Sequence, residues 1–85
     1  MMGHEYEQIR FTSSARKHRV GKASALRVIH GYAPEVLDLE RDKLVWVGFD
    51  ERGRELEVIA VLENKELIVI HVMPRSYRRR GRTNG

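Results

Sequence analysis

The chain has 85 residues, with 16 lysines and arginines against 12 aspartates and glutamates, a net charge of +4 and no cysteine. This length accommodates one domain, and the lack of cysteine excludes a disulfide framework and a thiolate zinc site. Small secreted scaffolds depend on such links, so we expect a protein of the reducing cytoplasm. No apolar run approaches the roughly 20 residues that span a bilayer, and the polar start MMGHEYEQ is not typical of a signal peptide. We therefore expect no membrane association, while a small enzyme, a nucleic-acid binder and an adaptor all remain open.

The first part of the chain predicts one strand followed by two short helices. Residues 6–12 alternate weakly between polar and apolar side chains, as in a strand. Residues 14–19 follow a run of hydroxyl side chains that can cap a helix, and residues 22–30 form a second helix that Gly31 is placed to end. The buried stripe of the second helix is predicted from three- and four-residue spacing as Ala23, Ala25, Leu26 and Ile29.

The second part changes to a period of two residues. Residues 44–49, 54–62 and 67–73 are rich in strand-forming side chains. The turns DERG (50–53) and ENKE (63–66) separate them and are short enough for hairpins. Three consecutive antiparallel strands are therefore predicted, and the apolar 67–73 segment is expected to be a central strand covered on both faces.

A further edge strand over Glu35–Leu39 would extend this meander to four strands. The predicted fold is α+β, with an N-terminal strand and two short helices packed on a three- to four-stranded antiparallel sheet. We expect a single domain over residues 1–80 and a disordered tail over 81–85. On the alternating count, Glu57 is expected to face solvent, with a role as general base as the alternative, while His71 shares a face with the apolar residues of its strand.

Charge is unevenly distributed along the chain. Residues 8–34 and 67–85 contain cations but no carboxylate, and an acidic middle, 35–66, separates them. In the last block all cations are arginines, whose planar guanidinium suits bidentate phosphate contacts. If the fold brings the two basic blocks together, they form one positive surface suited to RNA; the alternative is a solvated helix face plus a disordered tail.

The residue types fit the metal-independent cleavage of RNA better than other chemistry. The sequence carries no Gly-rich phosphate loop, no metal-ligand cluster and no nucleophile-elbow motif, so no metal or cofactor is expected. RNA supplies its own 2′-hydroxyl nucleophile, and the protein must only move protons and stabilise charge on the phosphate. The catalytic candidates are His71 and Tyr77 for proton transfer, with Arg54 and Arg75 for the phosphate.

The candidates for holding the RNA backbone are cations of the two basic blocks and of the first turn: Arg16, Lys17, His18, Arg52, Arg78 and Arg79. Each has an ordinary alternative. His71 fits a core histidine satisfied by one hydrogen bond, and His18 fits a solvated surface residue. Arg52 and Arg54 could pair with neighbouring glutamates, and Tyr77 could pin the tail to the sheet.

The order of these motifs resembles the BrnT-type toxins, a branch of the RelE-like ribonuclease superfamily of bacterial type II toxin–antitoxin systems. The resemblance covers about residues 9–80 and depends on Arg16-Lys17-His18 at the end of a helix, Val47-Gly48, Arg52-Gly53-Arg54 at a turn, and the strand Leu67–Met73. The family's last strand usually runs into an S-A-R-type segment followed by a helix containing Glu. Here that place reads His71-Val72-Met73-Pro74-Arg75, and no acidic residue follows.

The resemblance implies a toxin that cleaves RNA and blocks translation. It also implies a cognate antitoxin that covers the basic surface, and operator DNA bound only through that antitoxin. By position it makes Arg52, Arg54 and the basic residues after the last strand candidates for RNA contact. A homodimer and a toxin–antitoxin hetero-oligomer are both compatible with it. The rival hypothesis is a non-catalytic RNA- or protein-binding module that uses the same basic surface.

Overall fold

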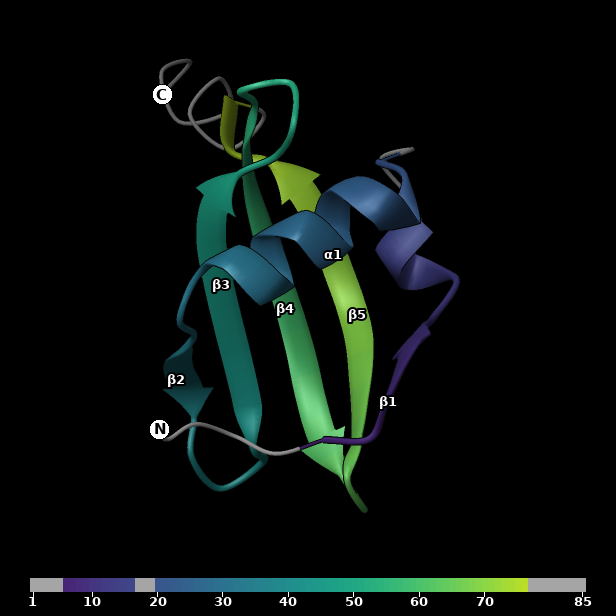
Figure 1. Cartoon of the computed structure of the whole chain (residues 1–85). Coiled ribbons are helices and arrows are strands. Elements are labelled where there is room, and N and C mark those ends of the chain that lie inside the picture. The colour runs from purple at the N-terminus through teal and green to yellow at the C-terminus, as the bar shows by residue number, and fades with distance from the viewer. Residues whose placement is uncertain (1–5, 17–19, 77–85) are drawn as a thin grey trace.

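The computed structural model describes residues 6–16 and 20–76. Its elements in chain order are β1 (Gln8–Phe11), the 3₁₀ helix η1 (Ser14–Arg16), α1 (Lys22–Gly31), β2 (Glu35–Asp38), β3 (Lys43–Phe49), β4 (Glu55–Glu63) and β5 (Glu66–Pro74). The strands form one five-stranded sheet in the order β1-β5-β4-β3-β2, and α1 lies diagonally across one face of it (Figure 1). The α+β class is confirmed.

The strand count and the purely antiparallel arrangement were predicted wrongly. Strands β2 to β5 form an antiparallel meander, but β1 joins the outer side of β5 in parallel, with Ile9 opposite Leu67. The sheet is therefore mixed. Two parallel strands must be joined by a crossover connection. The connection between β1 and β5 consists of η1, α1 and the strands β2 to β4. Alternation within a single strand carries no information about this long-range partner.

The tight turns were predicted correctly. Asn64 and Lys65 between β4 and β5 both have positive φ angles, 52° and 63°, as in the type I′ turn that suits a two-residue hairpin. Gly53 ends the β3–β4 turn at a φ of +75°, which favours glycine. The edge strand over Glu35–Leu39 is also confirmed, as β2.

Only one of the two predicted helices is an α-helix in the described residues. The described part of the first segment, Ser14–Arg16, is a 3₁₀ turn. There the Ala15 N–H donates to the carbonyl of Thr12 at 3.1 Å and lies 3.3 Å from its hydroxyl. Gly31 is not a left-handed cap either, because it is the last helical residue and the helix ends at the extended Tyr32.

Helix α1 is rotated by about one position from the predicted stripe. Ala23 is exposed and Leu26 only half-buried, whereas the core-facing residues are Ser24, Ala25, Val28 and Ile29. Ser24 tolerates its buried position because its hydroxyl donates to the Glu51 carboxylate at 3.0 Å. This bond also ties the β3–β4 turn to α1.

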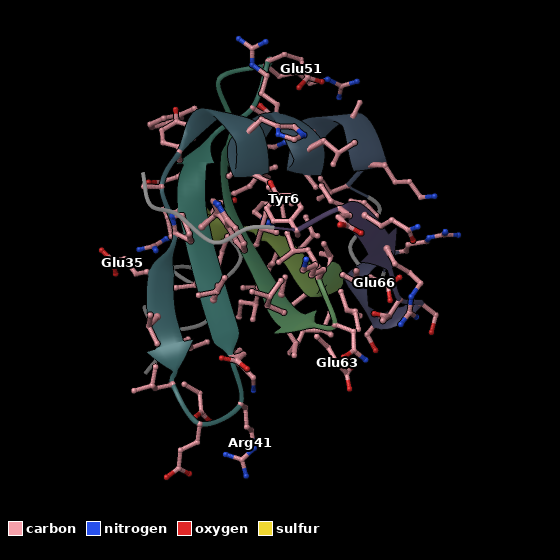
Figure 2. All side chains as sticks on the ribbon, turned by 60° about the horizontal axis from the view of Figure 1, so that its bottom comes forward. Tyr6, Glu35, Arg41, Glu51, Glu63 and Glu66 are labelled. Atoms are coloured by element: carbon pink, nitrogen blue, oxygen red, sulfur yellow. The ribbon has the colours of Figure 1, made fainter. Side chains whose placement is uncertain are left out.

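The hydrophobic core lies between α1 and the sheet. Helix α1 contacts β3 and β4 directly. The strands supply alternating side chains to the core, namely Leu44, Trp46, Leu56, Val58, Ala60, Leu67, Val69 and Val72. Charged side chains lie at the periphery: Glu35, Arg41 and Glu63 all point outward (Figure 2). No helix among the described residues is long and apolar enough to cross a membrane.

Candidate functional site

A carboxylate and an imidazole meet on the sheet face opposite α1. The Nε2 atom of His71 on β5 lies 3.3 Å from the Oε2 atom of Glu57 on β4. The His71 side chain is 30% exposed and that of Glu57 only 7%. The imidazole therefore reaches the surface above a carboxylate that is almost completely buried.

Strand β4 places Glu57 on this face by simple alternation. Leu56 and Val58 point into the α1-side core, so Glu57 between them points away from it. Its cross-strand neighbours are Val47 on β3 and Met73 on β5. The expected solvent exposure of Glu57 was wrong, because these neighbours and His71 surround a residue that isolated alternation would leave exposed.

A β-bulge on β5 places His71 beside Glu57. Ile59 is opposite His71, but the next residue of β4, Ala60, is opposite Val69, so Ile70 is an extra residue. The bulge reverses the alternation. His71 therefore lies on the face opposite to Val69, which is in the core, and the prediction that they share a face was wrong.

The pair lies in a mainly apolar row of the sheet. Ile59, Val45 and Met73 around it are half-buried, and Val47 beside Glu57 is 37% exposed. Apolar neighbours lower the local dielectric and strengthen the interaction between a carboxylate and an imidazole. Such a carboxylate orients the ring and stabilises its protonated form during proton transfer, which is the arrangement of many acid–base sites.

Three predicted arginines lie near the end of the sheet where β5 stops. Leu56 and Pro74 form the last pair of β4 and β5, so Arg54 and Arg75 lie just beyond it. The Nε atom of Arg75 is buried and has no hydrogen-bond partner among the described residues. A buried donor of this kind calls for an acceptor, and a phosphate oxygen is a suitable one. Arg52 is exposed in the neighbouring turn.

Arg54 is already engaged in organising its turn. Its guanidinium lies 3.0 Å from the Asp50 carboxylate, which also accepts the backbone N–H groups of Arg52 and Arg54 at 2.9 Å. Burial by itself raises the pKa of Asp50, but these hydrogen bonds and the charge of Arg54 outweigh it and hold the pKa below its ordinary value. The Arg54 side chain keeps 35% exposure, so the ion pair leaves part of it accessible.

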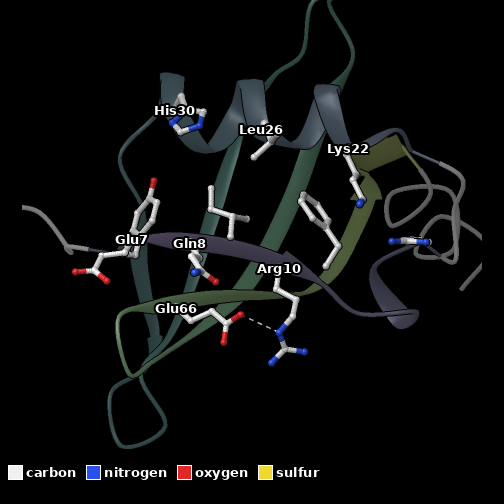
Figure 3. Close-up of a pocket in the computed structure, with 11 residues that line it drawn as sticks. Glu7, Gln8, Arg10, Lys22, Leu26, His30 and Glu66 are labelled. Carbon is white, nitrogen blue, oxygen red and sulfur yellow. Dashed lines mark hydrogen bonds and ion pairs between the residues drawn. The ribbon is translucent and has the colours of Figure 1, made fainter.

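A basic groove of about 750 Å³ lies between α1 and β1, on the other face of the sheet. Lys22, Leu26 and His30 on α1 face β1, while Arg10 forms an ion pair with Glu66 at 2.9 Å (Figure 3). Arg16 lines the same groove. The structure thus gathers Arg16 with cations of α1, but it does not bring Arg16 and His71 to one face.

Five of the predicted site residues lie outside the described residues: Lys17, His18, Tyr77, Arg78 and Arg79. Sequence reasoning considered Glu57 as a possible general base but did not predict its pairing with His71, which depends on the register of β4 and β5. Within residues 6–16 and 20–76, no group of three or more histidine, aspartate or glutamate side chains is placed to hold a metal ion.

Comparisons of the chain with known protein families, curated proteins and solved structures identify no relative. No family model matches the chain, and no significant match appears among curated proteins or solved structures.

Proposed function

We propose that this protein is a RelE-like toxin of the BrnT type, a metal-independent ribonuclease that cleaves RNA and so blocks translation. The observation that carries the proposal is the Glu57–His71 pair, a surface-accessible imidazole 3.3 Å from a buried carboxylate. The order of motifs in the sequence supports it, as does an α+β fold in which an antiparallel meander follows the helix.

In the proposed reaction, the 2′-hydroxyl of RNA attacks the adjacent phosphorus atom. The bond from phosphorus to the 5′-oxygen breaks, leaving a 2′,3′-cyclic phosphate and a 5′-hydroxyl. One proton leaves the 2′-hydroxyl and one is delivered to the 5′-oxygen. His71 makes one of these transfers and Tyr77 the other, while Glu57 orients the imidazole and balances its positive charge. Arg75, whose Nε atom has no hydrogen-bond partner among the described residues, stabilises the charge on the non-bridging phosphate oxygens.

The other predicted residues keep their proposed roles. Arg54 and Arg52 lie at the end of the sheet where Arg75 follows Pro74, and they contribute positive charge there. Tyr77 serves as a second proton-transfer group, and the terminal arginines hold the RNA backbone. A cognate antitoxin is the proposed protein partner. Operator DNA is bound through that antitoxin, and the complex acts in the cytoplasm.

Induced expression in a bacterial host tests the proposal. The wild type is expected to arrest growth with loss of RNA, whereas the His71→Ala/Arg75→Ala double variant grows normally at equal soluble protein levels. Arg41→Ala, which removes an exposed cation at the opposite end of the sheet, is the matched control and should remain toxic. Normal growth with soluble wild-type protein would contradict a self-sufficient ribonuclease.

The second candidate function is a non-catalytic RNA-binding module. The observation that favours it is the basic groove between α1 and β1, which contains Arg16 and Lys22 and does not involve His71. The two functions separate in one comparison. If RNA binding persists in the double variant while cleavage is lost, the ribonuclease hypothesis is supported. If the wild type binds RNA and never cleaves it, the binding-module hypothesis is supported.

A further inference from the structure

A second cavity, of about 590 Å³, lies between the C-terminal half of α1 and the end of β3. Two aromatic residues are part of its lining, and both are accessible: Tyr32 is 40% exposed and Phe49 is 51% exposed. Arg27 and His30 on α1 also line it and are exposed as well. Exposed aromatic side chains grouped with cations indicate a binding surface.

The strand layout explains why Phe49 is accessible. The pairing of β2 with β3 covers only Lys43 to Val45, so β3 extends beyond β2 and no strand flanks Phe49 on that side. Tyr32 is held over β3 by close contact with Gly48. The backbone of β3 and of the residue that ends α1 thus holds both aromatic residues near an open edge of the sheet.

The electrostatics of the cavity favour an anion. The one carboxylate in its lining, Asp50, has a fully buried side chain and is occupied by three hydrogen bonds from the Arg52 and Arg54 turn. Arg27 therefore determines the charge that a ligand meets. Cations beside accessible aromatic faces are the combination that binds single-stranded nucleic acid, through phosphate contacts and base stacking.

We propose that this cavity is a base-stacking subsite for single-stranded RNA, in which an unpaired base stacks on Phe49 beside Tyr32 and Arg27 contacts a phosphate. The inference rests on the proposed function in taking RNA as the ligand. It also connects the two faces of the sheet. Phe49 lies opposite Glu55 on β4, two residues from Glu57, so RNA held here reaches around the sheet edge toward the Glu57–His71 pair.

Binding is measured with two oligonucleotides that cannot be cleaved. Both are 2′-O-methyl strands of about eight nucleotides, one oligoadenylate and one fully abasic. The 2′-O-methyl group blocks the attacking oxygen, so the result is independent of ribonuclease activity. Fluorescence anisotropy at several salt concentrations gives the affinity and its salt dependence.

Phe49→Ser is expected to weaken oligoadenylate binding about tenfold and to leave abasic binding unchanged, because stacking alone is removed. Arg27→Ala should weaken the binding of both oligonucleotides. It should also reduce the steepness of the plot of log binding constant against log salt concentration by about one. The controls are Leu39→Ser, at a site 77% exposed, and Arg41→Ala, both at the opposite end of β3. Both controls should bind like the wild type, and thermal unfolding should verify that every variant is folded.

Any one of three results would overturn the subsite: no binding of oligoadenylate by the wild type, equal binding of the two strands by the wild type, or oligoadenylate binding that Phe49→Ser leaves unchanged. The last result would assign the aromatic pair to a protein partner instead. Because cleavage plays no part in this measurement, the subsite can fail while the ribonuclease proposal stands, and the converse also holds.

Discussion

At the scale of single residues, one glycine fixes the geometry of the aromatic edge. Gly48 on β3 is buried under the ring of Tyr32, and a Cβ atom placed on Gly48 would overlap that ring. The ring cannot keep its position if residue 48 carries a side chain. By contrast, Gly31 at the end of α1 has open space around its Cα and no positive φ.

Gly48→Ala is expected to lower the free energy of unfolding by about 1–3 kcal/mol, because the added methyl group displaces the Tyr32 ring. In a Tyr32→Ala background the same substitution should cost much less, because the ring that it displaces is gone. Gly31→Ala is the matched control, and it should be neutral or slightly stabilising. Urea unfolding of the four variants and the wild type measures these differences. An equal cost of Gly48→Ala in both backgrounds would refute the steric account.

At the scale of elements, local patterns predicted the turns and most strands, but not their long-range partners. The ENKE and DERG turns could be predicted because glycine, asparagine and short length act locally. The bulge at Ile70 could not, since it exists only through the pairing of β5 with β4. That one residue decides which face His71 occupies, and so the Glu57–His71 pair was not predictable. The parallel pairing of β1 with β5 was hidden for the same reason.

The β3–β4 turn carries an acid-sensitive contribution to stability. The pKa of Asp50 is lowered in the folded protein, so its carboxylate stabilises the fold above its ordinary value of 3.8. That contribution is lost as the pH falls through the folded-state pKa, which lies below this value. Asp50→Asn keeps one acceptor oxygen but loses the charge, and it should lower the unfolding free energy at neutral pH by about 1–3 kcal/mol.

The deficit of Asp50→Asn should shrink as the pH falls from 3.8 through the lower folded-state pKa of Asp50, because the wild-type carboxyl is neutralised over that range. Denaturant unfolding at a series of pH values measures this. Asp38→Asn is the control. It breaks an ion pair with Arg41, whose side chain is 72% exposed, so it should have a much smaller effect at any pH. A deficit for Asp50→Asn that stays constant down to acid pH would contradict the assignment.

At the scale of the whole molecule, the sheet separates two kinds of surface. One face carries α1, with the basic groove beside it, and the other carries the Glu57–His71 pair. Of the second basic block only Arg75 lies within the described residues, so the joining of the two basic blocks into one surface stays a prediction. The cavity at Phe49 lies near the open edge of β3, which is the route we propose for an RNA strand.

The central claim is that the Glu57–His71 pair cleaves RNA, and the most direct test is the rate of cleavage by the purified protein. We expect the wild type to produce 2′,3′-cyclic phosphate ends on RNA and to leave a 2′-O-methyl copy intact. His71→Ala should reduce the rate by about 10²- to 10⁴-fold, Glu57→Gln should reduce it less, and Arg41→Ala should not change it. Wild-type rates in His71→Ala, or cleavage of the 2′-O-methyl strand, would contradict the claim.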